Sequence, residues 1–243
     1  MAGSERVFES AVTLLGGGDF NERDLQTAMT WAPALVCADG AANILPELGL
    51  EPRLIVGDLD SISLTVRHRF RDRLHRISDQ DVTDFDKCLS VIVAPMIICV
   101  GFSGGRLDHE LSTLSSLAAF RGRPVIMLAR TQVCFRLPER LRLPLAVGTT
   151  VSVFPFTPSQ ARSRGLQWPL DGLVLSPSGL RGTSNRSISE VVDVEAERGD
   201  MLIILPRSEL ESVLCALLPE VVRVVSHAEE LAGKGGESGD FDL

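Results

Sequence analysis

The chain has 243 residues, of which 44% are hydrophobic and 23% charged, so it is long enough to bury the core of one large domain or two small ones. Its net charge of −8 argues against a nucleic acid or an anionic membrane as the main partner, because both require a basic surface. Only Lys87 and Lys234 are lysines, so nearly all the positive charge is carried by arginine, the better bidentate phosphate ligand.

Five scattered cysteines contain no CxxC pair, so neither a zinc site nor a disulfide framework is indicated. The apolar run near the N-terminus, Ala11 to Leu15, is too short for a signal peptide and lacks a preceding basic segment. The longest apolar stretch, Val91 to Val100, contains Pro95 and is far shorter than a membrane span. We therefore expect a soluble protein in the reducing cytoplasm.

The first half of the chain alternates short apolar runs with segments of helical spacing. The apolar runs predict buried strands at Ala11–Leu15, Ala34–Ala38, Arg53–Val56, Met96–Val100 and Pro124–Leu128. The segments between them predict helices at Asp24–Thr30, Ala41–Leu48, Leu64–Leu74, Asp84–Val93 and Asp108–Phe120. This rhythm is typical of βαβ units and a mostly parallel sheet, in which ligands bind beyond the carboxyl ends of the strands.

After about Leu137 the pattern changes to short, partly alternating runs separated by Pro, Gly and Ser. These runs predict strands at Leu141–Leu145, Thr150–Phe154, Gly172–Leu175, Val191–Glu195 and Met201–Leu205. A small antiparallel sandwich or barrel fits them. Residues 207–232 have a helical pattern, and residues 233–243 are typical of a disordered acidic tail. We expect domains at 1–140 and 141–206, followed by a helical extension and tail at 207–243.

Aspartates gather in two short segments, Gly57–Ser61 and Ser78–Lys87, each near a predicted strand. Two carboxylates 4 Å apart repel by about 4 kcal/mol at an effective dielectric near 20, so their convergence calls for a cation. Hard oxygen ligands in small number suit Mg²⁺, which shares its remaining positions with water and phosphate. A simpler reading is that Thr83 and Asp86 form a helix capping box and that the other aspartates lie in turns. Both segments together favour metal binding.

Glycine-rich loops follow three predicted strands, at Gly16–Gly18, Asp39–Gly40 and Gly101–Asp108. Their bare backbone amides are typical of a phosphate cradle, and Arg106 adds a forked cation. A rival interpretation is that the third loop is the G-x-S-x-G elbow of a serine hydrolase around Ser103. It is disfavoured because His109 is too close in sequence to complete a triad and His227 falls in the predicted extension.

Six blocks, in this order, resemble the thiamine pyrophosphokinase family: Ala38–Asn43, Gly57–Ser61, Asp79–Phe85, Gly104–Asp108, Gly165–Leu170 and Gly182–Asn185. The resemblance implies a Rossmann-like, mostly parallel α/β domain that binds ATP, followed by an antiparallel β-sandwich that binds thiamine. It also implies transfer of pyrophosphate from ATP to the thiamine hydroxyl, with release of AMP, and a homodimer whose active sites form between subunits.

The resemblance further implies roles for individual residues. Asp58, Asp60 and Asp84 would hold Mg²⁺ and carry catalysis. ATP and pyrophosphate would lie along Asp39, Gly40, Gln80, Asp81, Thr83, Gly104, Gly105, Arg106 and Asp108. Thiamine would be received by Trp168, Ser184 and Asn185. The chain departs from many relatives at Gly182, where they have serine, and residues 207–243 extend beyond the resemblance.

Two alternatives remain open from the sequence. One is a pyrophosphokinase that acts on another small alcohol, such as a hydroxymethylpterin; Trp168 and the Ser184–Asn185 pair argue against it. The other is a catalytically silent thiamine or nucleotide sensor, which would be expected to have lost metal-binding aspartates that this chain retains.

Overall fold

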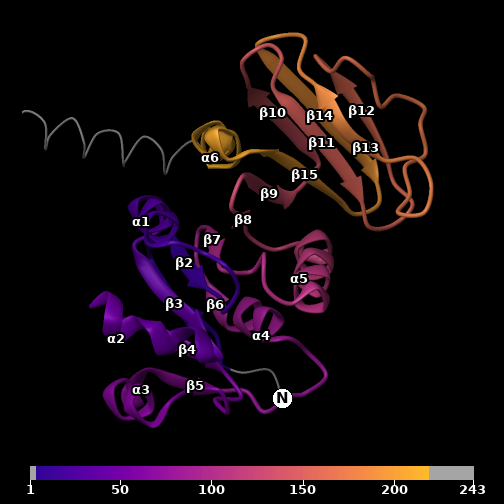
Figure 1. The fold of residues 1–243 in the computed structure, drawn as a ribbon. Helices are drawn as coiled ribbons and strands as arrows, with labels where there is room; N and C mark the ends of the chain where they lie inside the picture. The colour runs from indigo at the N-terminus through magenta and orange to yellow at the C-terminus, as the bar shows by residue number, and fades with distance from the viewer. Residues whose placement is uncertain (1–3, 219–243) are drawn as a thin grey trace, which may run out of the picture.

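The computed structural model describes residues 4–218, which form a mixed α/β region followed by an antiparallel β region (Figure 1). This order confirms the coarse fold predicted from the sequence. The tail predicted at 233–243, and the part of the predicted helix beyond residue 218, lie outside the described residues. Within residues 4–218, no helix is long and apolar enough to span a bilayer.

The sheet of the first half is built around β2 (Val12–Leu15). On one side β2 pairs in parallel with β7 (Ile97–Val100), which pairs in parallel with β8 (Val125–Leu128). On the other side lies β3 (Ala34–Ala38), where the Ala34 amide donates to the Ala11 carbonyl at 3.3 Å. Outward from β3 follow β4 (Leu54–Gly57) and β5 (Leu74–Arg76), both parallel. A short parallel pair, β1 (Arg6–Val7) and β6 (Ile92–Val93), lies apart from these ladders.

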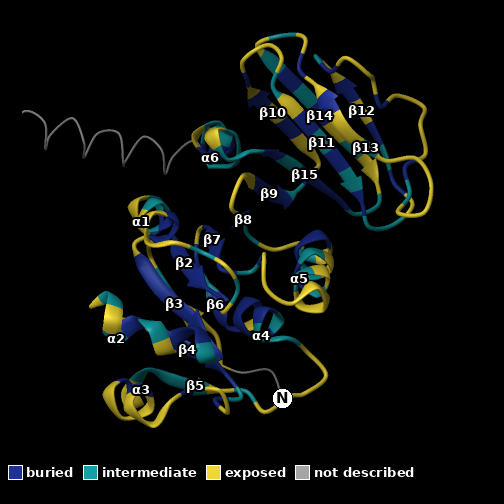
Figure 2. Ribbon diagram, viewed as in Figure 1, coloured by how far each residue is buried: buried dark blue, intermediate teal, exposed yellow. Residues whose placement is uncertain are grey.

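Helices cover this sheet and leave their outer faces exposed (Figure 2). They are α1 (Glu22–Trp31), α2 (Leu45–Leu48), α3 (Leu64–Arg69), α4 (Asp84–Val91) and α5 (Leu107–Ala119), with 3₁₀ turns at Asp39–Ile44 and Arg71–Arg73. Because successive strand residues point to opposite faces, Leu14 and Leu15 belong to two different core clusters. Capping boxes at Asn21 and Thr83 fix where α1 and α4 begin.

The second half holds two antiparallel ladders. One runs in the order β13 (Gly182–Arg186), β11 (Thr150–Pro155), β15 (Met201–Pro206) and β9 (Gln132–Arg136), and β9 then pairs with β8 of the first half. The other runs β10 (Arg140–Pro144), β14 (Val191–Arg198) and β12 (Gln160–Arg164). A 3₁₀ turn at Arg207–Glu209 leads into α6 (Leu210–Leu217), which packs on β10.

Several local predictions were wrong or incomplete. The helix predicted at Leu64–Leu74 ends at Arg69, and the chain returns to the sheet as β5. Residues 172–175, predicted as a strand, form a turn and a single-residue bridge between Leu175 and Ser159. Strand β9 was missed although its centre is buried. Strands β12 and β13 were missed because they are polar, and a search for apolar runs passes over them.

Candidate active site

A cleft of about 720 Å³ opens at the carboxyl ends of β2, β3, β4 and β7. The loops that follow these strands supply Gly16–Gly18, Asp39, Asp58 and Gly101 to its walls. Within the described chain, its lining residues all lie between Gly16 and Thr113. Parallel strands on both sides of β2 send their following loops to this edge, which is where ligands bind in open α/β sheets.

An acidic cluster lies on the floor of the cleft and consists of Asp39, Asp58 and Asp60. Carboxylate oxygens from the three residues lie within 4.8 Å of one another. Asp39 follows β3 with φ +41°, and a Cβ at Gly57 would stand 2.6 Å from the Asp39 Cβ, so Gly57 is needed for this close approach. Leu59, between the other two aspartates, has φ +68°, and its carbonyl accepts a hydrogen bond from Arg67.

Asp39 is the most constrained member of this cluster. Its side chain is buried, and its Oδ1 atom has no hydrogen-bond partner in residues 4–218. Burial raises the pKa of Asp39, and the neighbouring charges of Asp84 and Asp58 raise it further. An unpaired buried carboxylate oxygen, aimed among other carboxylates, fits the hard oxygen donor set of a divalent cation such as Mg²⁺.

Asp58 is held by two neighbours. Gln80 donates from Nε2 to its Oδ2 at 2.9 Å, and this hydrogen bond lowers the pKa of Asp58. On the same side, the Lys87 ammonium lies 3.7 Å from Asp58 Oδ2 and 3.0 Å from Asp84 Oδ1. The Lys87 side chain is only 4% exposed, so this is a nearly buried bridge between two acidic segments.

Burial by itself would lower the pKa of Lys87, but the hydrogen bond to Asp84 and the nearby carboxylates outweigh it and leave that pKa above its usual value. Sequence reasoning gave Lys87 no role in the site. The signal was available, since Lys87 is three residues after Asp84 on a helix that begins at the acidic segment.

The nucleotide candidates are distributed around the rim. Gly40, Gln80, Asp81, Thr83, Gly105 and Arg106 line the cleft, whereas Gly104 and Asp108 adjoin it. Arg106 holds Asp108 through two contacts, of 3.1 and 2.6 Å, and this hydrogen bonding lowers the pKa of Asp108 to about 2. Both of these side chains are exposed, so this fork is free to rearrange. In the described residues, no hydrogen bond joins the Ser103 hydroxyl to a histidine, and the hydrolase interpretation gains no support.

The thiamine candidates lie elsewhere. Trp168 is 57% exposed, and the backbone of Ser184 has φ +58° on β13. Asn185 is buried, where its Nδ2 donates to the Trp168 carbonyl at 2.7 Å and its Oδ1 accepts from the Trp168 amide at 3.1 Å. In Figure 1, β13 is well separated from β4 and α4, so one chain does not bring these residues to the acidic cluster.

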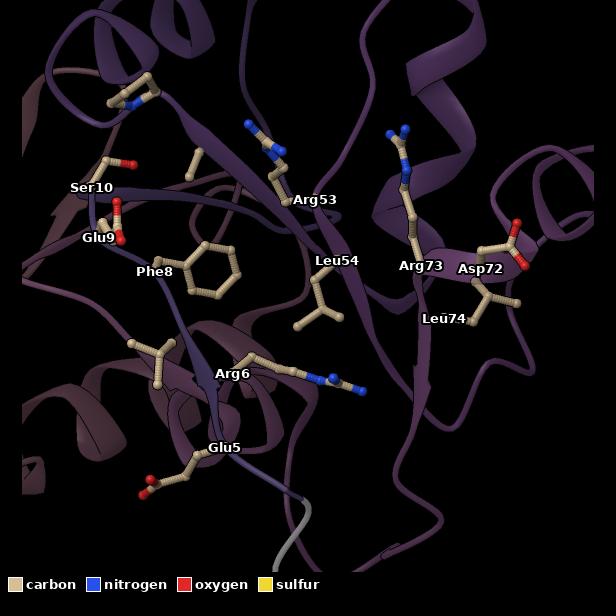
Figure 3. A pocket seen from close by; sticks show the side chains of 13 residues that line it. Glu5, Arg6, Phe8, Glu9, Ser10, Arg53, Leu54, Asp72, Arg73 and Leu74 are labelled. Carbon is tan, nitrogen blue, oxygen red and sulfur yellow. The ribbon is translucent and has the colours of Figure 1, made fainter.

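A second hollow, of about 770 Å³, opens at the amino ends of β3, β4 and β5, the opposite edge of the sheet (Figure 3). Arg6, Arg53 and Arg73 lie around its apolar floor. Arg73 is already bound to the Pro52 carbonyl and to Glu51. None of the residues predicted to be functional lines this hollow within the described range, so the acidic cleft is the candidate site.

Comparison with known families agrees with this choice. The family model described as thiamin pyrophosphokinase, catalytic domain, matches residues 25–127. The model described as thiamin pyrophosphokinase, vitamin B1 binding domain, matches residues 136–200. The chain belongs to the thiamine pyrophosphokinase family. The family predicted from the sequence is therefore confirmed, and with it an ATP-dependent, pyrophosphoryl-transferring enzyme.

Relatives of the thiamine pyrophosphokinase family are similar along most of the chain. Thiamine pyrophosphokinase 3 of rice is 30% identical over 203 residues, covering 68% of this chain and 76% of its own. Thiamine pyrophosphokinase 2 of Arabidopsis thaliana is 30% identical over 211 residues, covering 70% and 78%. These comparisons favour neither the pterin pyrophosphokinase nor the silent sensor.

Solved structures of thiamine pyrophosphokinases share the fold. The enzyme from Candida albicans superposes with a TM-score of 0.67 at 21% identity, covering 82% of this chain and 89% of its own. The yeast enzyme gives a TM-score of 0.66 at 19% identity, covering 85% and 92%. At such identities the likeness concerns the mixed α/β region and the antiparallel region that follows it.

Proposed function

We propose that this chain transfers the terminal pyrophosphoryl group of ATP to the hydroxyl of thiamine, giving thiamine diphosphate and AMP. The observation that carries the proposal is the acidic cluster at the carboxyl ends of β3 and β4, where Asp39 has a buried, unpaired carboxylate oxygen. It lies inside the segment matched by the catalytic-domain model.

Magnesium is the metal that this cluster fits best. Asp58 and Asp60 were expected as ligands from the sequence, and their approach to Asp39 supports adding that residue to the set. Asp84 lies across the Lys87 bridge and would take part from the other side. When bound, Mg²⁺ neutralises charge that develops on the transferred phosphates. The ligand set is all carboxylate oxygen, the donor type that Mg²⁺ prefers.

The nucleotide would lie across the glycine loops of the cleft. Gly17 and Gly105 offer backbone amides at its edge, whereas the Gly16 and Gly18 amides donate to the Val100 and Gly101 carbonyls. Arg106 offers a forked guanidinium to phosphate oxygens. Gln80 orients Asp58, and Thr83 begins α4 beside Asp81. We assign Gly40, Gly104 and Asp108 to the same path, where they would support the bound triphosphate.

Thiamine would bind to the second half of a partner subunit. The exposed ring of Trp168 suits a flat, cationic thiazolium through stacking and cation–π attraction. Exposed apolar side chains lie nearby in the sequence, at Leu173, Val174, Leu180 and Ile188, as expected for a face that packs against another chain. Ser184 and Asn185 complete this proposal, with Asn185 fixing the Trp168 backbone. The active unit would be a homodimer with the site between subunits.

We also propose a Rossmann-like first domain and a β-sandwich second domain. Strands arranged on both sides of β2 support a Rossmann-like nucleotide domain, and the two antiparallel ladders support a β-sandwich. A division near residue 140 is supported by family models that match 25–127 and 136–200. We propose the cytoplasm as its location, because five free cysteines suit a reducing compartment.

The decisive experiment is to incubate the purified full chain with ATP, Mg²⁺ and thiamine and to identify the products by chromatography and mass spectrometry. We expect thiamine diphosphate and AMP in equal amounts. A parallel reaction with a hydroxymethylpterin tests the alternative acceptor. Formation of ADP, or AMP release that does not depend on thiamine, would contradict the proposal.

A further inference from the structure

Lys87 is the one cation within salt-bridge distance of the acidic side chains of the cleft floor in residues 4–218. It joins two segments that are far apart in the sequence: Asp58 follows β4, and Asp84 begins α4. Arg106, the other cation that lines the cleft, is exposed and paired with Asp108. The cleft floor therefore holds four carboxylates, those of Asp39, Asp58, Asp60 and Asp84, against one ammonium.

The Lys87 ammonium contacts only some of these four carboxylates. It contacts Asp58 and Asp84, whereas Asp39 Oδ1 is left without a hydrogen-bond partner in the described chain. A fixed cation beside two carboxylates holds them in place and also reduces the attraction of the group for a free divalent cation. A bound polyphosphate adds negative charge that attracts both the Lys87 ammonium and the divalent cation. It therefore offsets the repulsion between these two cations.

We propose that Lys87 is a positioning residue that joins Asp58 to Asp84 and makes divalent-cation binding depend on a bound polyphosphate. The inference rests on the proposed function, since it takes the aspartates as the metal site. By linkage, the factor by which nucleotide tightens metal binding equals the factor by which metal tightens nucleotide binding. Lys87 sets the size of that factor.

The test measures metal affinity directly. Mn²⁺, which accepts the same oxygen ligands, is titrated into the full-length protein, and free Mn²⁺ is followed by electron paramagnetic resonance. Each titration is repeated with α,β-methylene-ATP, in which the bond broken during pyrophosphoryl transfer is blocked. Lys87→Met keeps the length of the side chain and removes its charge. We expect the variant to bind Mn²⁺ at least tenfold more tightly without nucleotide, and the tightening caused by the analogue to fall at least tenfold.

Two controls separate this role from a structural one. Arg121→Met removes the same charge from an exposed pair with Asp200, away from the cleft lining, and should leave both affinities unchanged. Lys87→Arg keeps the charge and should restore the dependence on nucleotide. If Lys87→Met does not give a native circular dichroism spectrum, Lys87→Gln carries the same expectation.

The possible results are distinct. If the wild-type protein binds Mn²⁺ and forms thiamine diphosphate, but Lys87→Met leaves the nucleotide-free Mn²⁺ affinity unchanged or weaker, the role of Lys87 is refuted and the proposed function stands. If the wild-type protein neither binds Mn²⁺ nor releases AMP, the proposed function fails and this inference fails with it. The inference is supported if Lys87→Met shows three changes together. These are a lower kcat, a higher KM for thiamine and tighter binding of Mn²⁺ without nucleotide.

Discussion

The two halves of the chain present their candidate residues in opposite ways. In the first half, side chains from separate loops converge: Asp39, Asp58 and Asp60 reach within 4.8 Å of one another. In the second half, the Asn185 side chain hydrogen-bonds to the backbone of Trp168, and the Trp168 residue is 57% exposed. The first half therefore has a cluster of negative charge that can bind a cation. The second half has an exposed aromatic ring that can contact a ligand or another chain.

The difference follows from how each region folds. Parallel strands bring their carboxyl ends to one edge, so loops distant in sequence meet there without a second chain. Antiparallel strands such as β10 present alternate residues to one face, and that face remains open until another surface covers it. We therefore propose that the acidic site assembles within the first half, whereas thiamine recognition by the second half requires a partner subunit.

The largest effect should come from removing charge from the acidic cluster. Asp58→Asn keeps the shape of the side chain but removes a carboxylate that contacts both Gln80 and Lys87. We expect kcat to fall about a thousandfold, or about 4 kcal/mol in the activation barrier. Steady-state assay of AMP formation measures this. Asp72→Asn, at the exposed turn before β5, is the matched control and should retain wild-type kcat; equal loss in both variants would argue against a special role for Asp58.

A smaller and more selective effect is expected from Trp168. Trp168→Ala should raise KM for thiamine about ten- to a hundredfold, because stacking and cation–π contacts contribute on the order of 1–3 kcal/mol. KM for ATP should change little, and separate titrations of the two substrates check this. The chain has one other tryptophan, Trp31, which packs against the core cluster that includes Leu25 and Leu35. Trp31→Phe should lower the melting temperature without altering the ratio of the two KM values.

The fold of the first half could be predicted because its strands are continuous apolar runs, such as Ile97–Val100, between helices with clear caps. Polar strands gave no such signal. β13 has the sequence Gly-Thr-Ser-Asn-Arg and is held by pairing with β11, a tertiary contact that no local pattern reveals. The strand predicted at residues 172–175 was wrong for the opposite reason, because the apolar run there follows a turn and forms no strand.

The site was predictable as a set of loops but not as a geometry. Aspartate-rich segments after strands located the cleft, and the family resemblance supplied candidate roles. It could not be read from the sequence that Asp39 approaches Asp58 and Asp60, because the approach depends on the positive φ of Asp39 and on the missing Cβ of Gly57. Likewise, Lys87 reaches Asp58 only when α4 packs against β4, whereas its contact with Asp84 lies within one helix.

The smallest expected effect is on the free energy of unfolding. It comes from Asp39, whose buried carboxylate suits metal binding but destabilises the metal-free fold. Its pKa is raised from the ordinary value of 3.8, first by burial and then by neighbouring carboxylates. Below pH 3.8 the Asp39 carboxyl is protonated in both the folded and the unfolded chain, and its contribution to stability is fully present. That contribution is lost as the pH rises through the raised pKa of the folded state. Asp39→Asn removes the charge at every pH.

We therefore expect metal-free Asp39→Asn to be more stable than wild type at neutral pH by roughly 1 kcal/mol, while its turnover falls. The stability difference should close as the pH is lowered below about 4, which urea unfolding at several pH values measures. Asp108→Asn should show the opposite trend, because the pKa of Asp108 is lowered to about 2 by its hydrogen bond with Arg106. A wild-type protein that is the more stable of the two at neutral pH without metal would mean that Asp39 is already neutralised within the chain, and the acidic cluster would then need no divalent cation.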